Sequence, residues 1–215
     1  MRIAANLTMM FPEMDLLQKY EKAAELGFQL VEVSLPYGWP MEKLQEQAEH
    51  YRLKHILINA PAGDWSKGFR GLAALSEQKS KYIESLNIAV QYAKKLNVQK
   101  VHVMAGIAEQ TDENFEVYVE NIRLACQQFK KDLFHAQQIC GQLTTTIETL
   151  APFTGHIQVA QVPGRHEPDT DGEINYSYVF NVLKKFGDWD VGCEYLNSGC
   201  DNQYLQWVYR YGLTF

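Results

Sequence analysis

Polar residues able to do chemistry stand where short apolar runs of the sequence end. In chain order they are Asn6, Glu32, Ser34, Asn59, His102, Gln158, Gln161 and Glu194. If the apolar runs are parallel strands, these side chains gather at the carboxyl edge of a sheet, where α/β proteins bind their ligands. The sequence shows no glycine-rich phosphate loop, Ser-His-Asp order or HExxH motif. Acid/base chemistry or metal binding therefore fits this set best.

Glu194 is the strongest candidate, because it ends the apolar run Val-Gly-Cys-Glu-Tyr at 191–195. A carboxylate at a strand end can bind a divalent cation or transfer protons. An ion pair with a nearby Arg or Lys is an equal alternative. Gln158 lies between Ile157 and Val159, so an inward-facing amide there needs a ligand, a water or a neighbour as its partner. A neighbouring side chain is the simpler interpretation.

Three more residues have suitable types and spacing. Asp132 and His135 stand three apart, a spacing that lets both contact one metal or one substrate, although such pairs are also common at helix starts. Arg165 lies in the polar loop Pro-Gly-Arg-His-Glu-Pro at 163–168. Its guanidinium can clamp a carboxylate with two hydrogen bonds, and a salt bridge within the loop is the favoured alternative for a lone arginine.

The elements that must position these residues follow from hydrophobic periodicity. The predicted strands cover residues 3–7, 30–35, 55–59, 101–105, 156–162 and 191–195, and amphipathic helical patterns cover about 16–24, 41–51, 82–93, 113–129 and 136–151. Gly27 is a stop signal for the first helix, and Phe115 belongs to the predicted inner face of the fourth. Strands that alternate with helices in this way indicate a parallel sheet with helical crossovers.

One interval breaks the alternation. Between residues 105 and 156 two helical patterns follow one another with no strand between them. A barrel of eight βα units takes about 250 residues, and one βαβ unit takes about 30 or more. The 215 residues of this chain therefore fall short by about the size of the segment that the pattern lacks.

Composition excludes several classes of function. The chain is 46% hydrophobic and 21% charged, with a net charge of -6 and a pI of about 5.5, which disfavours binding to nucleic acid or to an anionic membrane. Its four cysteines form no CxxC pair, and no apolar run approaches the length of a membrane span. The first residues read directly into a strand and leave no room for a signal peptide. We expect reduced cysteines and a cytoplasmic location.

Several of these stretches together resemble the hydroxypyruvate isomerases of the xylose-isomerase-like TIM-barrel superfamily. The matching segments are 5–7 (Ala-Asn-Leu), 57–64 (Leu-Ile-Asn-Ala-Pro-Ala-Gly-Asp), 101–106 (Val-His-Val-Met-Ala-Gly), 132–135 (Asp-Leu-Phe-His), 155–168 and 192–195 (Gly-Cys-Glu-Tyr). The resemblance implies an α/β fold of (β/α)8 TIM-barrel type. It also implies reversible isomerisation of hydroxypyruvate and 2-hydroxy-3-oxopropanoate (tartronate semialdehyde) through an enediolate.

Site roles also follow from the resemblance. It makes Glu194 one of two catalytic glutamates, places His135 and Arg165 beside the substrate, and makes Asp132, Gln158 and Glu194 ligands of a divalent cation, Mg²⁺ or Mn²⁺.

The other family glutamate has no counterpart in the sequence. It lies on a strand reading roughly Leu-Leu-Glu-Pro-Ile-Asn, and this chain passes from the helix near residue 129 directly to Asp132. We therefore expect one TIM-barrel-like domain over residues 1–215 that is incomplete, with about six strands and a deletion near 129–132. The expected consequence is an isomerase whose activity is greatly reduced or lost.

Other functions stay open at this point. A non-catalytic remnant would bind a partner or form homo-oligomers through the strand edges that the deletion exposes. A sugar epimerase shares the Asp-x-x-His and strand-end glutamate pattern, and a DNA-repair endonuclease is disfavoured by the negative charge and few strand-end histidines. The expected partner is a small hydroxy-keto acid, with no nucleic acid and no membrane.

Overall fold

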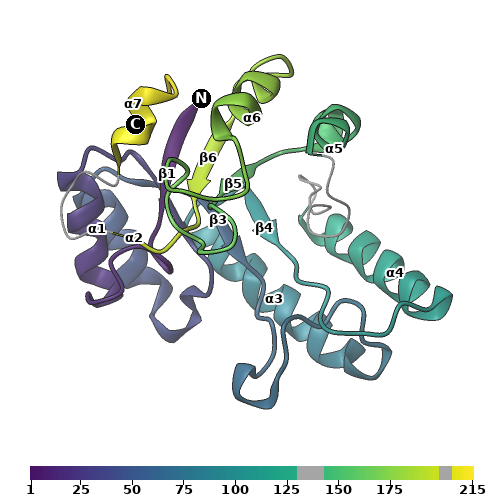
Figure 1. Ribbon diagram of the computed structural model, residues 1–215. Helices are drawn as coiled ribbons and strands as arrows, with labels where there is room; N and C mark the ends of the chain where they lie inside the picture. Colours follow the sequence, from purple (N-terminus) through teal and green to yellow (C-terminus); the bar gives the residue numbers. More distant parts are fainter. Residues whose placement is uncertain (130–142, 199–204) are drawn as a thin grey trace. The chain divides into compact units, whose positions relative to one another are not determined.

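Parallel strands and helices alternate along the chain (Figure 1) in a computed structural model that describes residues 1–129, 143–198 and 205–215. The strands are β1 (Arg2–Asn6), β2 (Leu30–Val33), β3 (Lys54–Asn59), β4 (Lys100–His102), β5 (Ile157–Val159) and β6 (Asp190–Cys193). The helices are α1 (Leu16–Glu25), α2 (Met41–His50), α3 (Lys79–Lys95), α4 (Asp112–Phe129), α5 (Leu143–Leu150), α6 (Tyr176–Leu183) and α7 (Gln206–Arg210). Short 3-10 turns are η1 (Pro36–Gly38), η2 (Trp65–Lys67), η3 (Ser76–Gln78) and η4 (Ala151–Phe153).

The chain groups into two compact units. The first takes the described residues of Met1–Glu32, Gln47–Lys54 and Leu133–Phe215, and the second takes those of Val33–Glu46 and His55–Asp132. Every residue of the site described below belongs to the first unit.

The first unit is built on four parallel strands in the order β2-β1-β6-β5. Figure 1 shows β1, β6 and β5 running next to one another. The C-terminal part of the chain contributes a core of large aromatic side chains to this unit. In that core the Phe180 and Trp207 rings stack with centroids 6.0 Å apart, and Trp207 Nε1 donates to the Tyr195 hydroxyl over 3.1 Å. Burial of such aromatic surface is the main favourable term for folding this unit.

The second unit carries the parallel pair β3–β4 and packs α3 against α4. Its core cluster comprises Ala60, Leu72, Ala73, Tyr82, Leu86, Ala89 and Ala125. The Tyr82 hydroxyl donates to the carbonyl of Asn121, and the Asn121 amide donates to the carbonyl of Ala73, over 2.7 and 2.9 Å. These bonds satisfy polar groups that are buried within the cluster.

The local signals explain most element boundaries. Asp15 caps α1 in a capping box with Gln18, and Gly27 follows it in the left-handed region at φ +88°, as the stop signal predicted. All six predicted strands are confirmed, although each ends within the predicted range. The inward orientation of Phe115 is wrong, because its side chain is 67% exposed. Part of the fifth helical pattern, 136–142, lies outside the described residues.

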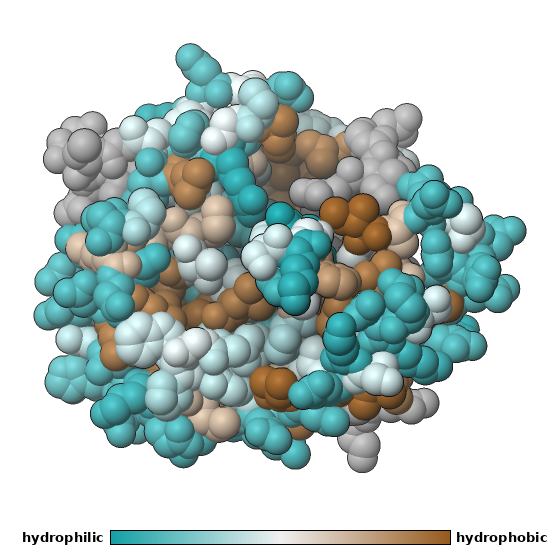
Figure 2. Space-filling view, turned by 90° about the horizontal axis from the view of Figure 1, so that it is seen from below, coloured by the Kyte–Doolittle hydropathy of each residue, from teal (hydrophilic) through white to brown (hydrophobic). Residues whose placement is uncertain are grey.

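Hydrophilic residues cover much of the face shown in Figure 2, and the hydrophobic ones form small separate patches. Within the described part of the chain, no helix combines the length and apolar character needed to cross a membrane.

Candidate active site

Strand register brings a set of polar side chains to one face of the first unit's sheet. Asn6 of β1 pairs with Glu32 of β2, and Gln158 of β5 pairs with Gly192 of β6. Paired residues of parallel strands point to the same face, and residues two apart along a strand do so as well. Because Ala4 also pairs with Gly192, Asn6, Glu32 and Gln158 share one face.

Glu32 is the centre of this set. Its side chain is fully buried in an otherwise apolar strand and takes donors from two other strands. The amide nitrogens of Asn6 and Gln158 donate to Oε2 over 3.1 and 2.9 Å, and His156 contacts Oε1 through Nε2. A buried carboxylate is tolerated only with such partners. The Glu32 cluster, meaning Glu32 with Asn6, His156 and Gln158, therefore ties β2, β1 and β5 together.

A glycine on β6 makes room for the Glu32 carboxylate. A Cβ atom added at Gly192 would clash with both carboxylate oxygens. Glycine is thus required at position 192, because the Glu32 carboxylate lies so close to its backbone.

We expect Gly192→Ala to lower the free energy of unfolding by about 1–3 kcal/mol, because the added methyl displaces the buried carboxylate from its donors. Urea denaturation measures the change. Gly38→Ala is the matched control, since nothing lies within 4 Å of a Cβ atom at that glycine. Equal stability of the two variants would contradict the proposed close packing.

Glu194 follows β6 directly, two residues beyond Gly192, and its backbone N–H donates to the Gly192 carbonyl over 3.1 Å. Its carboxylate forms an ion pair with Arg165, whose Nη2 lies 3.1 Å from Oε1. Arg165 Nε also donates to the Glu194 carbonyl over 3.3 Å. The predicted alternative of an ion pair with a nearby arginine is thus present, and it places a cation and a carboxylate together at the carboxyl end of the strands.

The environment raises the pKa of Glu194. Burial is the largest cause, and the Glu32 charge acts in the same direction, whereas Arg165 and His156 lower the pKa. Because the pKa is higher in the folded state, the contribution of Glu194 to stability is present below its unfolded pKa and is lost as pH rises through the folded pKa. A carboxylate with a raised pKa is better suited to take up a proton near neutral pH.

Removing the Arg165 charge is expected to raise the pKa of Glu194 further, because Arg165 opposes the effect of burial. A ¹³C NMR titration of the Glu194 carboxyl in Arg165→Gln measures the shift. Lys22→Gln serves as the control, since Lys22 pairs with Glu25 on α1. An unchanged or lowered midpoint in Arg165→Gln would contradict the ion pair.

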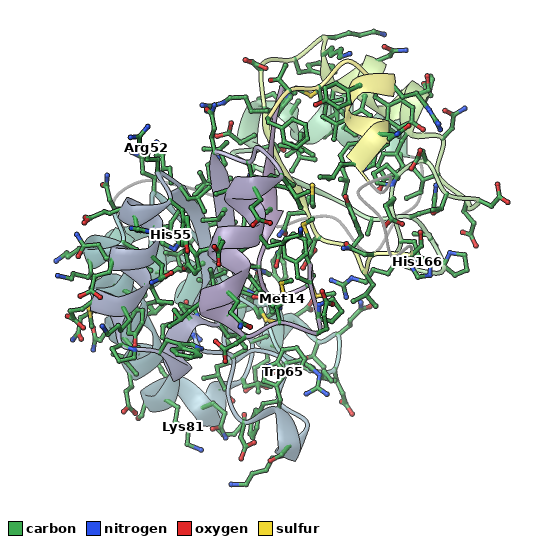
Figure 3. All side chains as sticks on the ribbon, turned by 90° about the vertical axis from the view of Figure 1, so that its left-hand side faces the viewer. Met14, Arg52, His55, Trp65, Lys81 and His166 are labelled. Atoms are coloured by element: carbon green, nitrogen blue, oxygen red, sulfur yellow. The ribbon has the colours of Figure 1, made fainter. Side chains whose placement is uncertain are left out.

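The loop after β5 holds Arg165 in place through a buried glutamine. Gln161 Nε2 donates to the carbonyls of Pro168, Thr170 and Ile174, and its Oε1 accepts from the backbone of Val162 and Ile174. His166, labelled in Figure 3 on this loop, contacts the Leu196 carbonyl through Nδ1 over 3.0 Å. The loop is therefore bonded to the segment that carries Glu194. Gln161 is a structural residue here.

The predicted site residues divide into two groups. Gln158, Arg165 and Glu194 lie in the first unit, and Arg165 contacts Glu194 directly. Asp132 and His135 lie outside the described residues. Gln158 turns its amide nitrogen to Glu32, so a neighbouring side chain satisfies it, as the simpler interpretation held.

The expected divalent metal requires several oxygen or nitrogen ligands close together. Among the described residues, no three His, Cys, Asp or Glu side chains are grouped closely enough to hold a metal ion. The Glu194 carboxylate is paired with Arg165, and Gln158 would add only an amide oxygen. The described residues alone do not fit a metal centre.

Sequence reasoning placed Glu32 among the polar residues at strand ends without giving it a specific role, and it did not single out His156. The available signal was a charged residue inside the apolar run Leu-Val-Glu-Val at 30–33, since a buried carboxylate requires partners. Its partners come from β1 and β5, far away in the sequence, so only the strand order reveals them.

A parallel α/β fold with carboxylates at the carboxyl ends of its strands is typical of TIM-barrel isomerases. The chain belongs to the xylose isomerase-like TIM barrel family, which it matches over residues 20–132. It is 40% identical to a Caenorhabditis elegans protein provisionally named as a hydroxypyruvate isomerase, with 100% of this chain and 98% of that one covered. It is 31% identical to the hydroxypyruvate isomerase of Escherichia coli, with 98% and 99% covered. It is 32% identical to the 2-oxo-tetronate isomerase of Haemophilus influenzae, again with 98% and 99% covered.

Solved structures agree on the fold. A protein described as AP endonuclease, family 2, from Brucella melitensis superposes with a TM-score of 0.87 at 33% identity, and 98% of each chain is covered. The 3-keto-D-glucoside 4-epimerase of Escherichia coli superposes with a TM-score of 0.71 at 12% identity, with 98% of this chain and 99% of that one covered. At that identity the likeness concerns the fold alone. The predicted α/β TIM-barrel-type fold is confirmed.

Proposed function

We propose that this chain is a shortened isomerase of small hydroxy-keto acids, acting on hydroxypyruvate and 2-hydroxy-3-oxopropanoate, with reduced activity. The observation that carries the proposal is Glu194, a carboxylate with a raised pKa at the carboxyl end of β6 and in contact with Arg165. The relatives support the substrate class, since hydroxypyruvate and 2-oxo-tetronate are both 2-oxo acids with a hydroxyl group on the next carbon.

The chemistry needs one proton transfer away from carbon and one back. Glu194 removes a proton from C3 of hydroxypyruvate, and the electron pair moves to the C2 carbonyl oxygen to give an enediolate. The C3 hydroxyl proton passes to the C2 oxygen, and return of a proton to C2 gives 2-hydroxy-3-oxopropanoate. C3 is oxidised while C2 is reduced, so no external oxidant is required. The Arg165 guanidinium binds the substrate carboxylate.

The length of the alignments supports a shortened form. The alignment with the Caenorhabditis elegans relative spans 260 positions against the 215 residues of this chain, so at least 45 positions have no residue here. That is more than one βα unit. We place the missing segment near 129–132, at the start of residues that the structure does not describe.

A sensitive test separates proton abstraction from complete turnover. In D₂O, loss of the C3 proton signal of hydroxypyruvate by ¹H NMR detects enolisation even when the second proton transfer fails. We expect the protein to speed this exchange above the buffer rate, and Glu194→Gln to abolish the effect. Glu173→Gln, exposed on the loop after β5, is the control. Exchange at the buffer rate in the unaltered protein would overturn the proposal.

We propose that any divalent cation is bound weakly. The predicted ligands Glu194 and Gln158 supply few free oxygens, and Asp132 would have to complete the set. Titration with Mn²⁺ followed by electron paramagnetic resonance is expected to give a dissociation constant near 1 mM or weaker, compared with tighter binding to a full-length relative. Micromolar binding would contradict this expectation.

A second candidate is a non-catalytic remnant that associates through strand edges. Within the described residues, β5 pairs with β6 alone and β4 with β3 alone, so each has an edge without a described strand partner. This role predicts an oligomer whose mass rises with concentration in light scattering, together with no deuterium exchange.

We also propose a cytoplasmic location, in agreement with the free, buried thiol of Cys193.

A further inference from the structure

The loop that follows β3 is fixed to the backbone around it. In this β3 loop, residues 60–74, the N–H of Gly71 donates to the carbonyl of Ala62 over 2.9 Å. Gly71 has φ +129°, and a Cβ atom there would clash with the Met104 carbonyl of the segment after β4. Because glycine has no Cβ, the two backbones can lie this close together. The backbone next to Arg70 is therefore held in place.

The side chain of Arg70 is held by the same loop. Its Nη1 donates to the carbonyls of Trp65 and Phe69 over 3.2 and 2.7 Å. Its guanidinium carbon lies 4.3 Å from the centre of the Trp65 ring, over the face of the indole. Cation–π attraction favours this stacking. The planar guanidinium is thus oriented by the protein alone.

The bonds within the loop use one side of the Arg70 guanidinium. The group has five N–H donors in a planar fork, and both bonds to the loop carbonyls come from Nη1. Nε and Nη2 form another edge, whose parallel N–H groups match two oxygens of a carboxylate or phosphate. Asp64, the one acidic residue of the β3 loop, is paired with Lys67 at 3.4 Å. Among the residues that the structure describes, Arg70 has no ionic partner.

The surroundings of Arg70 favour an anion. Lys81 of α3 lies with Nζ 6.0 Å from the centre of the Phe69 ring, which adds a second cation near the loop. Arg70 is partly exposed and Trp65 is 46% exposed, and Figure 3 labels both Trp65 and Lys81. This local positive charge contrasts with the net charge of -6 for the whole chain. Loops at the carboxyl ends of parallel strands are also where α/β proteins bind their ligands.

We propose that Arg70, stacked on Trp65, forms an oxyanion-binding site in which Nε and Nη2 hold two oxygens of a carboxylate or a phosphate. Lys81 raises the local positive charge and so favours the bound anion. The inference goes beyond the proposed function and does not rest on it, because these residues belong to the second unit, whereas Glu194 and Arg165 belong to the first.

Two anions that share this chemistry test the site in the whole protein. Acetate and inorganic phosphate are titrated separately into ¹⁵N-labelled protein at constant ionic strength, with chloride as the balancing anion. We expect the Arg70 Nε–H and Trp65 Nε1–H signals to shift with saturation, at a dissociation constant of about 10 mM or lower. Saturation by acetate alone assigns the site to carboxylates, saturation by phosphate alone assigns it to phosphates, and saturation by both assigns it to either oxyanion.

The variant Arg70→Lys keeps the charge and removes the fork, so we expect the Trp65 signal to report binding that is about tenfold weaker. Arg123→Lys is the matched control and should keep the affinity, because Arg123 is an exposed arginine of α4 in the same unit. If Arg70→Lys does not fold, Trp65→Leu removes the stacking instead. We expect this variant to bind about threefold more weakly, as reported by the Arg70 signal.

Three results would overturn the inference. The first is an unaltered protein whose Arg70 and Trp65 signals show no saturable shift with either anion. The second is a set of saturable shifts confined to Arg165, which would place the anion in the first unit. The third is full affinity retained in Arg70→Lys or, in its place, in Trp65→Leu. A loss of stability in Arg70→Lys without anion binding by the unaltered protein would mean that this arginine only braces the β3 loop.

Discussion

Purified protein is expected to turn over hydroxypyruvate about 10²–10⁴ times more slowly than the hydroxypyruvate isomerase of Escherichia coli, the range associated with losing one acid/base group. Isomerisation moves a proton from one carbon to its neighbour, and the family resemblance assigns that task to two facing glutamates. On the function proposed above, this chain acts with Glu194 and lacks a counterpart of the other. ¹H NMR of both compounds measures the forward and reverse rates.

The expected loss of rate follows from the second of the two proton transfers. In the proposed reaction Glu194 accepts the first proton, and its raised pKa favours that protonation. Return of the proton then depends on water or on Glu194 itself. The expected signature is deuterium exchange at C3 that exceeds product formation, whereas a complete pair of glutamates would give exchange and isomerisation at similar rates.

Restoring the segment proposed to be missing near 129–132 provides the control for the slow turnover. A chimera that carries the corresponding segment of the Caenorhabditis elegans relative, at least 45 residues, is expected to recover most of the lost rate. The same chimera with its restored strand glutamate changed to glutamine should return to the slow rate. Turnover by the unaltered 215-residue chain at the rate of the full-length enzyme would refute the argument.

The fold was predictable where the hydrophobic residues of the sequence recur with a clear period. The apolar runs that become β1, β3 and β6 are bounded by polar or turn residues, and their lengths leave little choice of structure. The fifth strand was overextended to residue 162, because its apolar character continues while its backbone turns into the loop that Gln161 braces. Phe115 was misplaced because an aromatic residue in the helical period need not find a neighbour to pack against.

The site was predictable only in part, because some of its contacts depend on strand order and not on local sequence. Glu194 and Arg165 each stand in a recognisable local pattern, and their ion pair joins two loops that follow neighbouring strands. The role of Glu32 depends on the absence of a side chain at Gly192 and on the order of the strands. Neither relation can be derived from the local sequence around Glu32.

The Glu32 cluster also has a testable energetic consequence. His156→Leu is expected to lower the free energy of unfolding by about 1–3 kcal/mol, because it removes one hydrogen-bonding partner of a fully buried carboxylate and leaves that carboxylate with the two amides alone. Thermal and urea denaturation at neutral pH measure the loss. Asp190→Asn, which breaks the more exposed pair with Arg2, is the control and should cost at most about 1 kcal/mol.

A double variant separates the buried charge from simple loss of packing. Glu32→Leu combined with His156→Leu removes the carboxylate as well as its partner, and replacement of both partners of a buried hydrogen bond by apolar groups can be nearly neutral or stabilising. The double variant should therefore recover part of the stability that His156→Leu loses. If it is instead less stable than His156→Leu by the full cost of a second core substitution, packing of the side chains, and not the buried charge, determines the stability of this cluster.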